Sequence, residues 1–137
     1  MFDIVWDNKY LIGVERIDHE HQVFFDLIRN VARASHQEMP RTRVLRLLTA
    51  LRKYADFHFC SEENLMLDSE YPHYVGHKKE HEMLLSYFDD QFQQYRLGGG
   101  DLTKLLEFLV DWFILHTTKT DRTVAEFLNS DKLSTAA

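Results

Sequence analysis

Apolar residues recur at helical spacing over four long stretches, and this pattern constrains the fold of the chain more than any other feature. In each stretch apolar side chains return every three or four residues, which places them on one face of a helix. The stretches cover about 19–36, 40–69, 72–97 and 102–129. No stretch of comparable length alternates as a β-strand does, so the sequence predicts an all-α protein.

Prolines and glycines separate the four stretches. Pro40 and Pro72 stand where proline is favoured, at the start of a helix, and three glycines at 98–100 stand where glycine ends one. Those glycines follow a helix and lack the lysine and hydroxyl of a phosphate loop. Asp18 and Asp101 are expected to cap the first and fourth helices. Four such helices with short connections predict an up-down-up-down antiparallel four-helix bundle.

The two ends of the chain are expected to differ from the bundle, which is assigned to residues 18–130. Residues 1–17 form a predicted extended arm, whose Trp6 and Tyr10 can pack on the bundle. Residues 131–137 are polar or small and are expected to fray.

Charge and composition exclude several classes of partner. The chain has 16 basic and 22 acidic residues, a formal net charge of −6, and no cluster of basic residues. Nucleic acid and anionic membrane surfaces both need grouped lysine and arginine, so neither is expected as a partner. The sequence has no apolar run of about 18 residues for a membrane span, and its first residues do not resemble a signal peptide. Since Cys60 is the only cysteine, no internal disulfide forms, and a cytoplasmic location is expected.

Five histidines and two carboxylates interrupt the apolar faces of the predicted helices. They are His21, His58, Glu62, His77, His81, His116 and Asp121. With a rise of about 1.5 Å per residue, an antiparallel bundle brings all seven near the same end. Burying so many ionisable groups without a cation carries a heavy desolvation cost, so the cluster predicts a metal site.

The number of candidate ligands predicts two metals. Imidazole and carboxylate without thiolate suit iron, zinc, manganese or copper. If both carboxylates and an oxo or hydroxo group bridge, two octahedral metals are filled except for one position, where a small ligand can bind. The set is richer in nitrogen than ferritin-type di-iron sites, which favours reversible ligand binding over oxygenation.

The spacing of His116 and Asp121 does not fit an ideal helix. A gap of five residues turns the second side chain about 140° from the first. A carboxylate that bridges two metals can reach in from further round, and a local π-helical distortion would help it do so.

Four segments carry the seven residues in a characteristic order. They are Ile-Asp-x-x-His at 17–21, HFCSEENLM at 58–66, YPHYVGHKKEH at 71–81 and Trp-x-x-x-His-x-x-x-x-Asp at 112–121. This order resembles the hemerythrin family, specifically its bacterial members. The resemblance extends over about residues 4–128 and includes Trp6 of the arm.

The resemblance implies a non-haem di-iron centre (Fe2+/Fe3+) that binds O2 reversibly. Three histidines would hold one iron: His77, His81 and His116. Two would hold the other iron, which keeps the open position: His21 and His58. Both carboxylates, Glu62 and Asp121, would bridge the ions together with an oxo or hydroxo group.

The resemblance also implies the walls of an O2 pocket. Four of them are aromatic residues that the helical pattern already places in the core: Phe25, Phe59, Trp112 and Phe113. Thr117 stands where the family usually carries an isoleucine. Its hydroxyl has three options, which are to hydrogen-bond the ligand, to admit water, or to bond back to its own helix.

Other polar residues near the cluster are expected to face away from it. His19 points to a different side from His21 and should lie at the surface near the pocket mouth. Cys60 lies about 200° round the helix from His58. The run at 78–80, Lys-Lys-Glu, is interpreted as a solvated face.

Three functions are compatible with the sequence. The leading one is an O2 carrier for storage, delivery or scavenging. The alternative is an O2- or redox-sensing domain that signals through a protein partner, which the sequence does not identify. An enzyme that handles peroxide or nitric oxide ranks last, because the inward faces offer no acid–base residue beyond the ligands.

Overall fold

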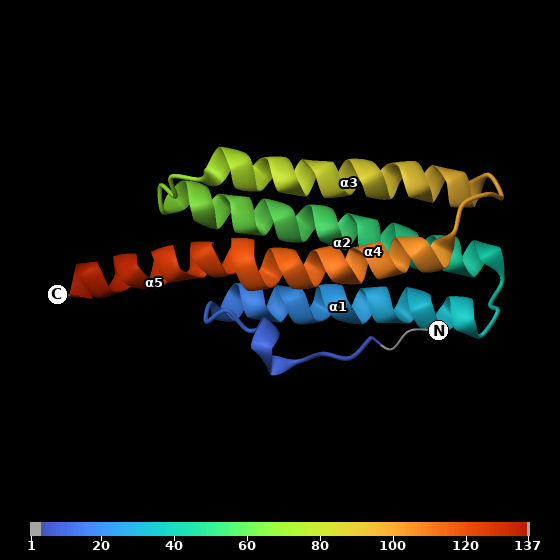
Figure 1. Ribbon diagram of the computed structural model, residues 1–137, viewed down its shortest axis with the longest axis horizontal. Helices are drawn as coiled ribbons and strands as arrows, with labels where there is room; N and C mark the ends of the chain where they lie inside the picture. Colours follow the sequence, from blue (N-terminus) through green and yellow to red (C-terminus); the bar gives the residue numbers. More distant parts are fainter. Residues whose placement is uncertain (1–3, 137) are drawn as a thin grey trace.

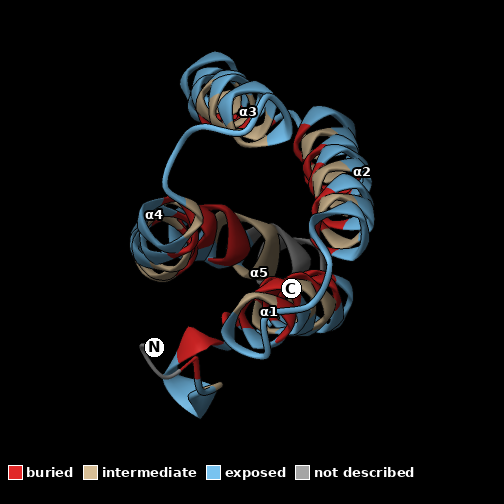
Figure 2. Cartoon of the chain, turned by 90° about the vertical axis from the view of Figure 1, so that its right-hand side faces the viewer, coloured by how far each residue is buried: buried red, intermediate tan, exposed pale blue. Residues whose placement is uncertain are grey.

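The chain folds into long antiparallel helical rods that lie side by side around a common core (Figures 1 and 2). The computed structural model describes the backbone of residues 4–136 and the side chains of residues 4–130. The first three rods are α1 (Glu15–His36), α2 (Arg41–Asp68) and α3 (Tyr74–Arg96).

The fourth rod is continuous through three elements, α4 (Leu102–Leu115), the π-helical segment η2 (His116–Asp121) and α5 (Arg122–Ala136). α1 and α3 each pack against both α2 and α4. The prediction of an all-α, up-down-up-down bundle is confirmed. None of the described helices is long and apolar enough to cross a membrane.

The turn between α3 and α4 follows the chemistry of its residues. Leu97 is the C-cap of α3, and Gly98 then adopts a φ of +94°, a left-handed conformation that glycine reaches without strain. The backbone N–H of Gly99 closes the turn on the Gln94 carbonyl at 2.9 Å. Asp101 caps α4 as predicted, because its carboxylate accepts a hydrogen bond from the Lys104 N–H at 3.1 Å.

Two predicted helix starts are wrong. α1 begins at Glu15, so Asp18 is not its N-cap but lies in its first turn. The Asp18 carboxylate turns back and accepts hydrogen bonds from the backbone N–H groups of Ile12 (2.8 Å) and Gly13 (3.1 Å). It therefore ties the end of the arm to the helix. α3 begins at Tyr74 and not at Pro72, which lies in the preceding turn.

The fourth rod extends beyond its predicted end at residue 129. Its helical backbone continues to Ala136, and the fraying expected for residues 131–137 stays a prediction. Neither proline nor glycine occurs after Arg122, so nothing in the sequence breaks the helix there. Ala137 lies outside the described residues.

The N-terminal arm contains the 3-10 turn η1 (Asn8–Tyr10) and packs on the bundle. The Trp6 ring meets Phe25 edge-on at 5.7 Å and Tyr10 at 5.3 Å. The Arg29 side chain donates to the Ile4 carbonyl, and the Arg122 side chain to the Lys9 carbonyl, both at 2.9 Å. The arm is thus held by aromatic packing and by two arginines that donate hydrogen bonds to its backbone carbonyls.

Apolar side chains fill the bundle on both sides of the polar cluster. The large core includes Phe88, Leu48, Leu51 and Leu105, and a smaller cluster groups Met66, Tyr71 and Val124. Each large apolar side chain buried in this way contributes about 1.5–3 kcal/mol. The polar groups between these two clusters are therefore shielded from water on both sides.

We expect Asp18→Ala to lower the stability of the fold. The substitution leaves two backbone N–H groups without their carboxylate, which costs about 1 kcal/mol. For a chain of this size that loss lowers Tm by about 4 °C. Thermal unfolding followed by circular dichroism measures it, with Asp90→Ala, an exposed site in the C-terminal third of α3, as the matched control. Equal Tm values for the two variants would contradict the proposed role of Asp18.

Candidate metal centre

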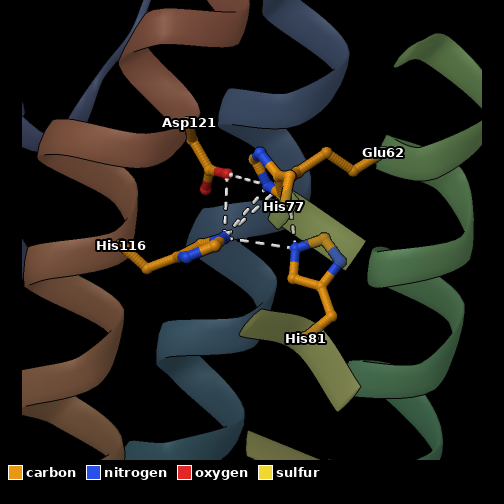
Figure 3. Close-up of side chains that lie close together, drawn as sticks. All are labelled: Glu62, His77, His81, His116 and Asp121. Carbon is orange, nitrogen blue, oxygen red and sulfur yellow. Dashed lines mark hydrogen bonds and ion pairs between the residues drawn. The ribbon is translucent and has the colours of Figure 1, made fainter. Parts of the chain in front are cut away.

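The seven predicted ligands meet in one buried cluster near one end of the bundle. α1 supplies His21, α2 supplies His58 and Glu62, α3 supplies His77 and His81, and η2 supplies His116 and Asp121. All seven side chains are buried, none with more than 5% of its surface exposed. Figure 3 shows Glu62, His77, His81, His116 and Asp121 pointing toward one another.

Three histidines surround one side of the two carboxylates. On this side the Nε2 atom of His77 lies 2.5 Å from Oε1 of Glu62 and 3.0 Å from Oδ1 of Asp121. His81 Nε2 lies 3.2 Å from the same Glu62 oxygen, and His116 Nε2 lies 3.1 Å from the same Asp121 oxygen. We call this set of imidazoles the three-histidine group.

Two histidines approach the other oxygens of the same carboxylates. His21 Nε2 lies 3.1 Å from Oδ2 of Asp121, and His58 Nε2 lies 3.3 Å from Oε2 of Glu62. We call this pair the two-histidine group. Each carboxylate therefore turns one oxygen to each histidine group, as a bridging ligand must.

The ligand atoms satisfy the distances of two adjacent metal positions. One position combines the three-histidine group with Glu62 and Asp121, and the other combines the two-histidine group with the same two carboxylates. Within each position the ligand atoms lie within 4.8 Å of one another. Sharing both carboxylates is the arrangement expected for a pair of metal ions, not for two separate sites.

The π-helical segment explains the five-residue gap between His116 and Asp121. In a π-helix the hydrogen bonds run from residue i to i+5, which widens the turn. Residues five apart then share a face, and the Nε2 of His116 comes to 3.1 Å from Oδ1 of Asp121. The predicted local distortion is present, and it spans the two residues and the four between them.

Several buried polar atoms of the cluster lack hydrogen-bond partners. Glu62 Oε2 and both oxygens of Asp121 are buried and accept no hydrogen bond from the described residues. The Nε2 atoms of His77 and His81 each lie 3.1 Å from Nε2 of His116. Ring nitrogens that converge at this distance, beside two carboxylates, suit a cation between them.

Burial and ion pairing oppose each other in setting the pKa values of the cluster. Burial disfavours the imidazolium form of His21, but Asp121 and Glu62 outweigh it and raise its pKa to about 9. The same balance raises the pKa of His77 to about 9 and that of His116 to about 10. Burial favours protonated Glu62 and Asp121, yet the surrounding histidines hold both pKa values below their usual range. A metal must therefore displace protons from these imidazoles.

Carboxylates bind the outer nitrogens of three of the five histidines. Glu20, buried on α1, lies 2.8 Å from Nδ1 of His58 and also accepts the Ser61 hydroxyl at 2.9 Å. Glu63 lies 2.8 Å from Nδ1 of His81. Such partners fix the ring orientation and tautomer of a ligating histidine and raise its basicity.

The third outer carboxylate is Glu80. It lies on an exposed face, as expected, but its Oε2 also lies 2.9 Å from Nδ1 of His116. All three outer carboxylates were missed, because each binds a histidine of a different helix and the pairing depends on the packing of those helices. His19 and Cys60 are exposed, as predicted.

Two predicted pocket residues pack on the three-histidine group. The Phe59 ring stacks on His81 at 4.0 Å and 7°, and the Trp112 ring stacks on His116 at 4.2 Å and 13°. Each of these two imidazoles is thus fixed by a stacked ring on its face and by a carboxylate at its outer nitrogen.

The two-histidine group is walled by different rings. Phe113 meets His21 edge-on at 5.3 Å, and Phe24, which the sequence analysis did not single out, meets His58 at 6.0 Å. The ring of Phe25 packs against that of Phe113, with the ring centroids 5.7 Å apart. Thr117 is fully buried in η2.

We expect the protein stripped of metal to be most stable near pH 5–6.5. The raised pKa values of His21, His77 and His116 add stability that is complete below about pH 6.5, the value of unfolded histidine. That stability is lost as the pH rises through 9 to 10. The lowered pKa values of Glu62 and Asp121 act in the opposite sense, with stability lost as the pH falls below about 4.

Thermal unfolding of chelator-treated protein between pH 4 and pH 10 tests this expectation. The Tm should fall between pH 6.5 and pH 10. Metal-loaded protein, whose imidazoles would coordinate metal in place of these protons, should not show this fall. A Tm of the stripped protein that is flat from pH 5 to pH 10 would refute the ion-paired cluster.

The sequence of this chain is similar to those of known proteins. The family model described as the hemerythrin HHE cation binding domain matches residues 12–128. A bacteriohemerythrin of Clostridium acetobutylicum is 24% identical over 127 residues, covering 86% of this chain and 95% of its own. One from Methylococcus capsulatus is 28% identical over 106 residues, covering 77% and 80%. Hemerythrin subunit 1 of Golfingia vulgaris is 32% identical over 85 residues, covering 62% and 68%.

Solved structures agree with the sequence matches. A crystal structure of wild-type hemerythrin superposes with a TM-score of 0.83 at 25% identity, covering 90% of this chain and 96% of the other. The family model matches well over half of the chain, and the bundle has the fold of hemerythrin. This chain therefore belongs to the hemerythrin family.

Proposed function

We propose that the cluster holds two iron ions and that the protein binds O2 reversibly, as a carrier and not as an enzyme. One iron would lie in the three-histidine group and the other in the two-histidine group. Glu62 and Asp121 would bridge them alongside an oxo or hydroxo group. The observation that carries the proposal is the division of each carboxylate, with one oxygen facing each histidine group.

The unequal histidine groups supply a place for the ligand. Both metal positions share the same two carboxylates, but one has three imidazoles and the other has two. The position with His21 and His58 therefore has one protein donor fewer, and an incomplete donor set is what separates a reactive site from a structural one. We assign O2 binding to this position.

The surroundings of His21 and His58 favour a small apolar ligand. Bound iron would supply the electrons that O2 takes up and returns on release. The chain itself holds both imidazoles in place and packs the rings of Phe113 and Phe24 against them. These rings would keep water away from bound O2, and the exclusion of water favours reversible binding.

Storage, delivery or scavenging of O2 in the cytoplasm is the role that we propose for such a carrier. Bacteriohemerythrins are among the relatives that this chain resembles over most of its length. The sensing alternative requires a protein partner.

Absorption spectroscopy tests the proposed function. We expect anaerobically reduced, iron-loaded protein to gain a ligand-to-metal charge-transfer band in air and to lose it under vacuum. Glu62→Ala, which removes a bridge, should bind less iron and lack the band, whereas Glu82→Ala, exposed on α3, should behave as wild type. Protein loaded with two irons but without a reversible band would refute the carrier. Peroxide turnover faster than decay of the oxygenated form would favour an enzyme instead.

We expect Thr117→Ile to slow autoxidation several-fold. Thr117 follows His116 directly and is fully buried, so its hydroxyl is a buried polar group on the element that carries His116 and Asp121, where an isoleucine would be apolar. A hydroxyl there favours water in the pocket, and water promotes loss of the oxygenated form. Decay of the charge-transfer band in air measures the rate. The control is Thr118→Val, because the Thr118 hydroxyl already bonds back to the Ile114 carbonyl at 2.7 Å. Equal or faster autoxidation in Thr117→Ile would remove this role of Thr117.

A further inference from the structure

The five candidate histidine ligands differ in what their outer nitrogens contact. The Nδ1 atoms of His21 and His77 are buried and make no hydrogen bond to the described residues. His58 is bound to Glu20 and His81 to Glu63, and both of these carboxylates are largely shielded from solvent.

Glu80 differs from the other two outer carboxylates in its exposure. Its side chain keeps 48% of its surface in solvent, against 18% for Glu63 and 7% for Glu20. Within the described part of the chain, its single ion pair is the one with His116, and no lysine or arginine lies within 4.0 Å of it. The charge of this carboxylate is therefore directed at one imidazole.

His116 is held in a defined orientation by three different contacts. Its Nε2 faces the cluster, the Trp112 ring stacks on its face at 4.2 Å, and Glu80 lies 2.9 Å from its Nδ1. With Nε2 turned to a metal, the proton of the neutral ring lies on Nδ1 and is donated to Glu80. The tautomer and the position of the ring are thus set together.

A surface pocket brings this contact within reach of solvent. The pocket has a volume of about 290 Å³ and lies between α3 and the fourth rod. It is lined by Glu80, Met83, Trp112, Leu115, His116 and Thr120. A cluster ligand therefore forms part of the wall of a surface pocket, next to the carboxylate that binds it.

We infer that Glu80 is a positioning residue that lowers the reduction potential of the metal bound by the three-histidine group. A carboxylate that accepts the Nδ1 proton makes the imidazole a stronger donor. A stronger donor favours the more highly charged, oxidised metal over the reduced one. The inference deepens the proposed function, because it rests on a metal centre at this cluster.

Glu80→Gln separates the charge of this residue from its hydrogen bond. The amide oxygen can still accept the Nδ1 proton, so His116 keeps its place while the negative charge is lost. We expect the variant to bind iron and to have a higher midpoint potential in an anaerobic spectroelectrochemical titration. A tenfold change in the relative stability of the oxidised and reduced forms corresponds to about 59 mV for a one-electron step.

Two further variants serve as controls. Glu82→Gln removes a charge from an exposed residue two positions along α3 and should leave the potential unchanged. Glu80→Asp keeps the charge and should give a potential closer to wild type than Glu80→Gln does. As a second readout, stripped Glu80→Gln should bind Co²⁺ about tenfold more weakly than Glu82→Gln, in line with the loss of an outer partner of a metal ligand.

The outcomes distinguish the role of Glu80 from the proposed function. If Glu80→Gln and Glu82→Gln share the wild-type potential and the same Co²⁺ affinity, Glu80 has no tuning role, although the metal centre stands. If neither wild type nor Glu82→Gln binds iron, the metal centre itself is refuted and the tuning role with it. A higher potential in Glu80→Gln alone, with its thermal stability unchanged, establishes the inference.

Discussion

Two buried carboxylates surrounded by five imidazoles are the interaction on which the rest of this structure depends. Glu62 and Asp121 lie fully inside the bundle, where isolated negative charges are very costly. Their stability requires positive charge on each side, from protonated histidines or from metal. Every rod of the bundle contributes at least one histidine to meet this requirement, so the packing of the helices and the chemistry of the cluster are a single problem.

The division of the carboxylate oxygens makes the two sides of the cluster different. Three histidines face one pair of oxygens and two face the other. The aromatic surroundings differ accordingly, with stacked rings on His81 and His116 and edge-on rings at His21 and His58. The outer carboxylates differ as well, since two of the three bind histidines of the three-histidine group. We interpret the three-histidine group as the more rigidly held side, and we propose the two-histidine group as the side that binds O2.

Much of this arrangement can be predicted from the sequence, and the failures are instructive. The helical period, the proline and glycine breaks and the simple antiparallel order suffice to place all seven residues in one cluster. The gap of five between His116 and Asp121 even indicates the π-helical segment. Asp18 is misassigned because a carboxylate within a first turn and one at an N-cap look alike in sequence. Its actual partners, the N–H groups of Ile12 and Gly13, depend on how the arm folds back.

The sequence by itself determined which residues face the core, because a helix converts spacing along the chain directly into a face. The sequence therefore determined the four-helix bundle and which residues make up the buried cluster. Only the tertiary structure decided which oxygen faces which histidine, and that Glu20, Glu63 and Glu80 bind outer nitrogens. Those contacts join different helices, and their distances depend on the rotation and axial shift of one helix against another. No periodicity within a single helix records either quantity.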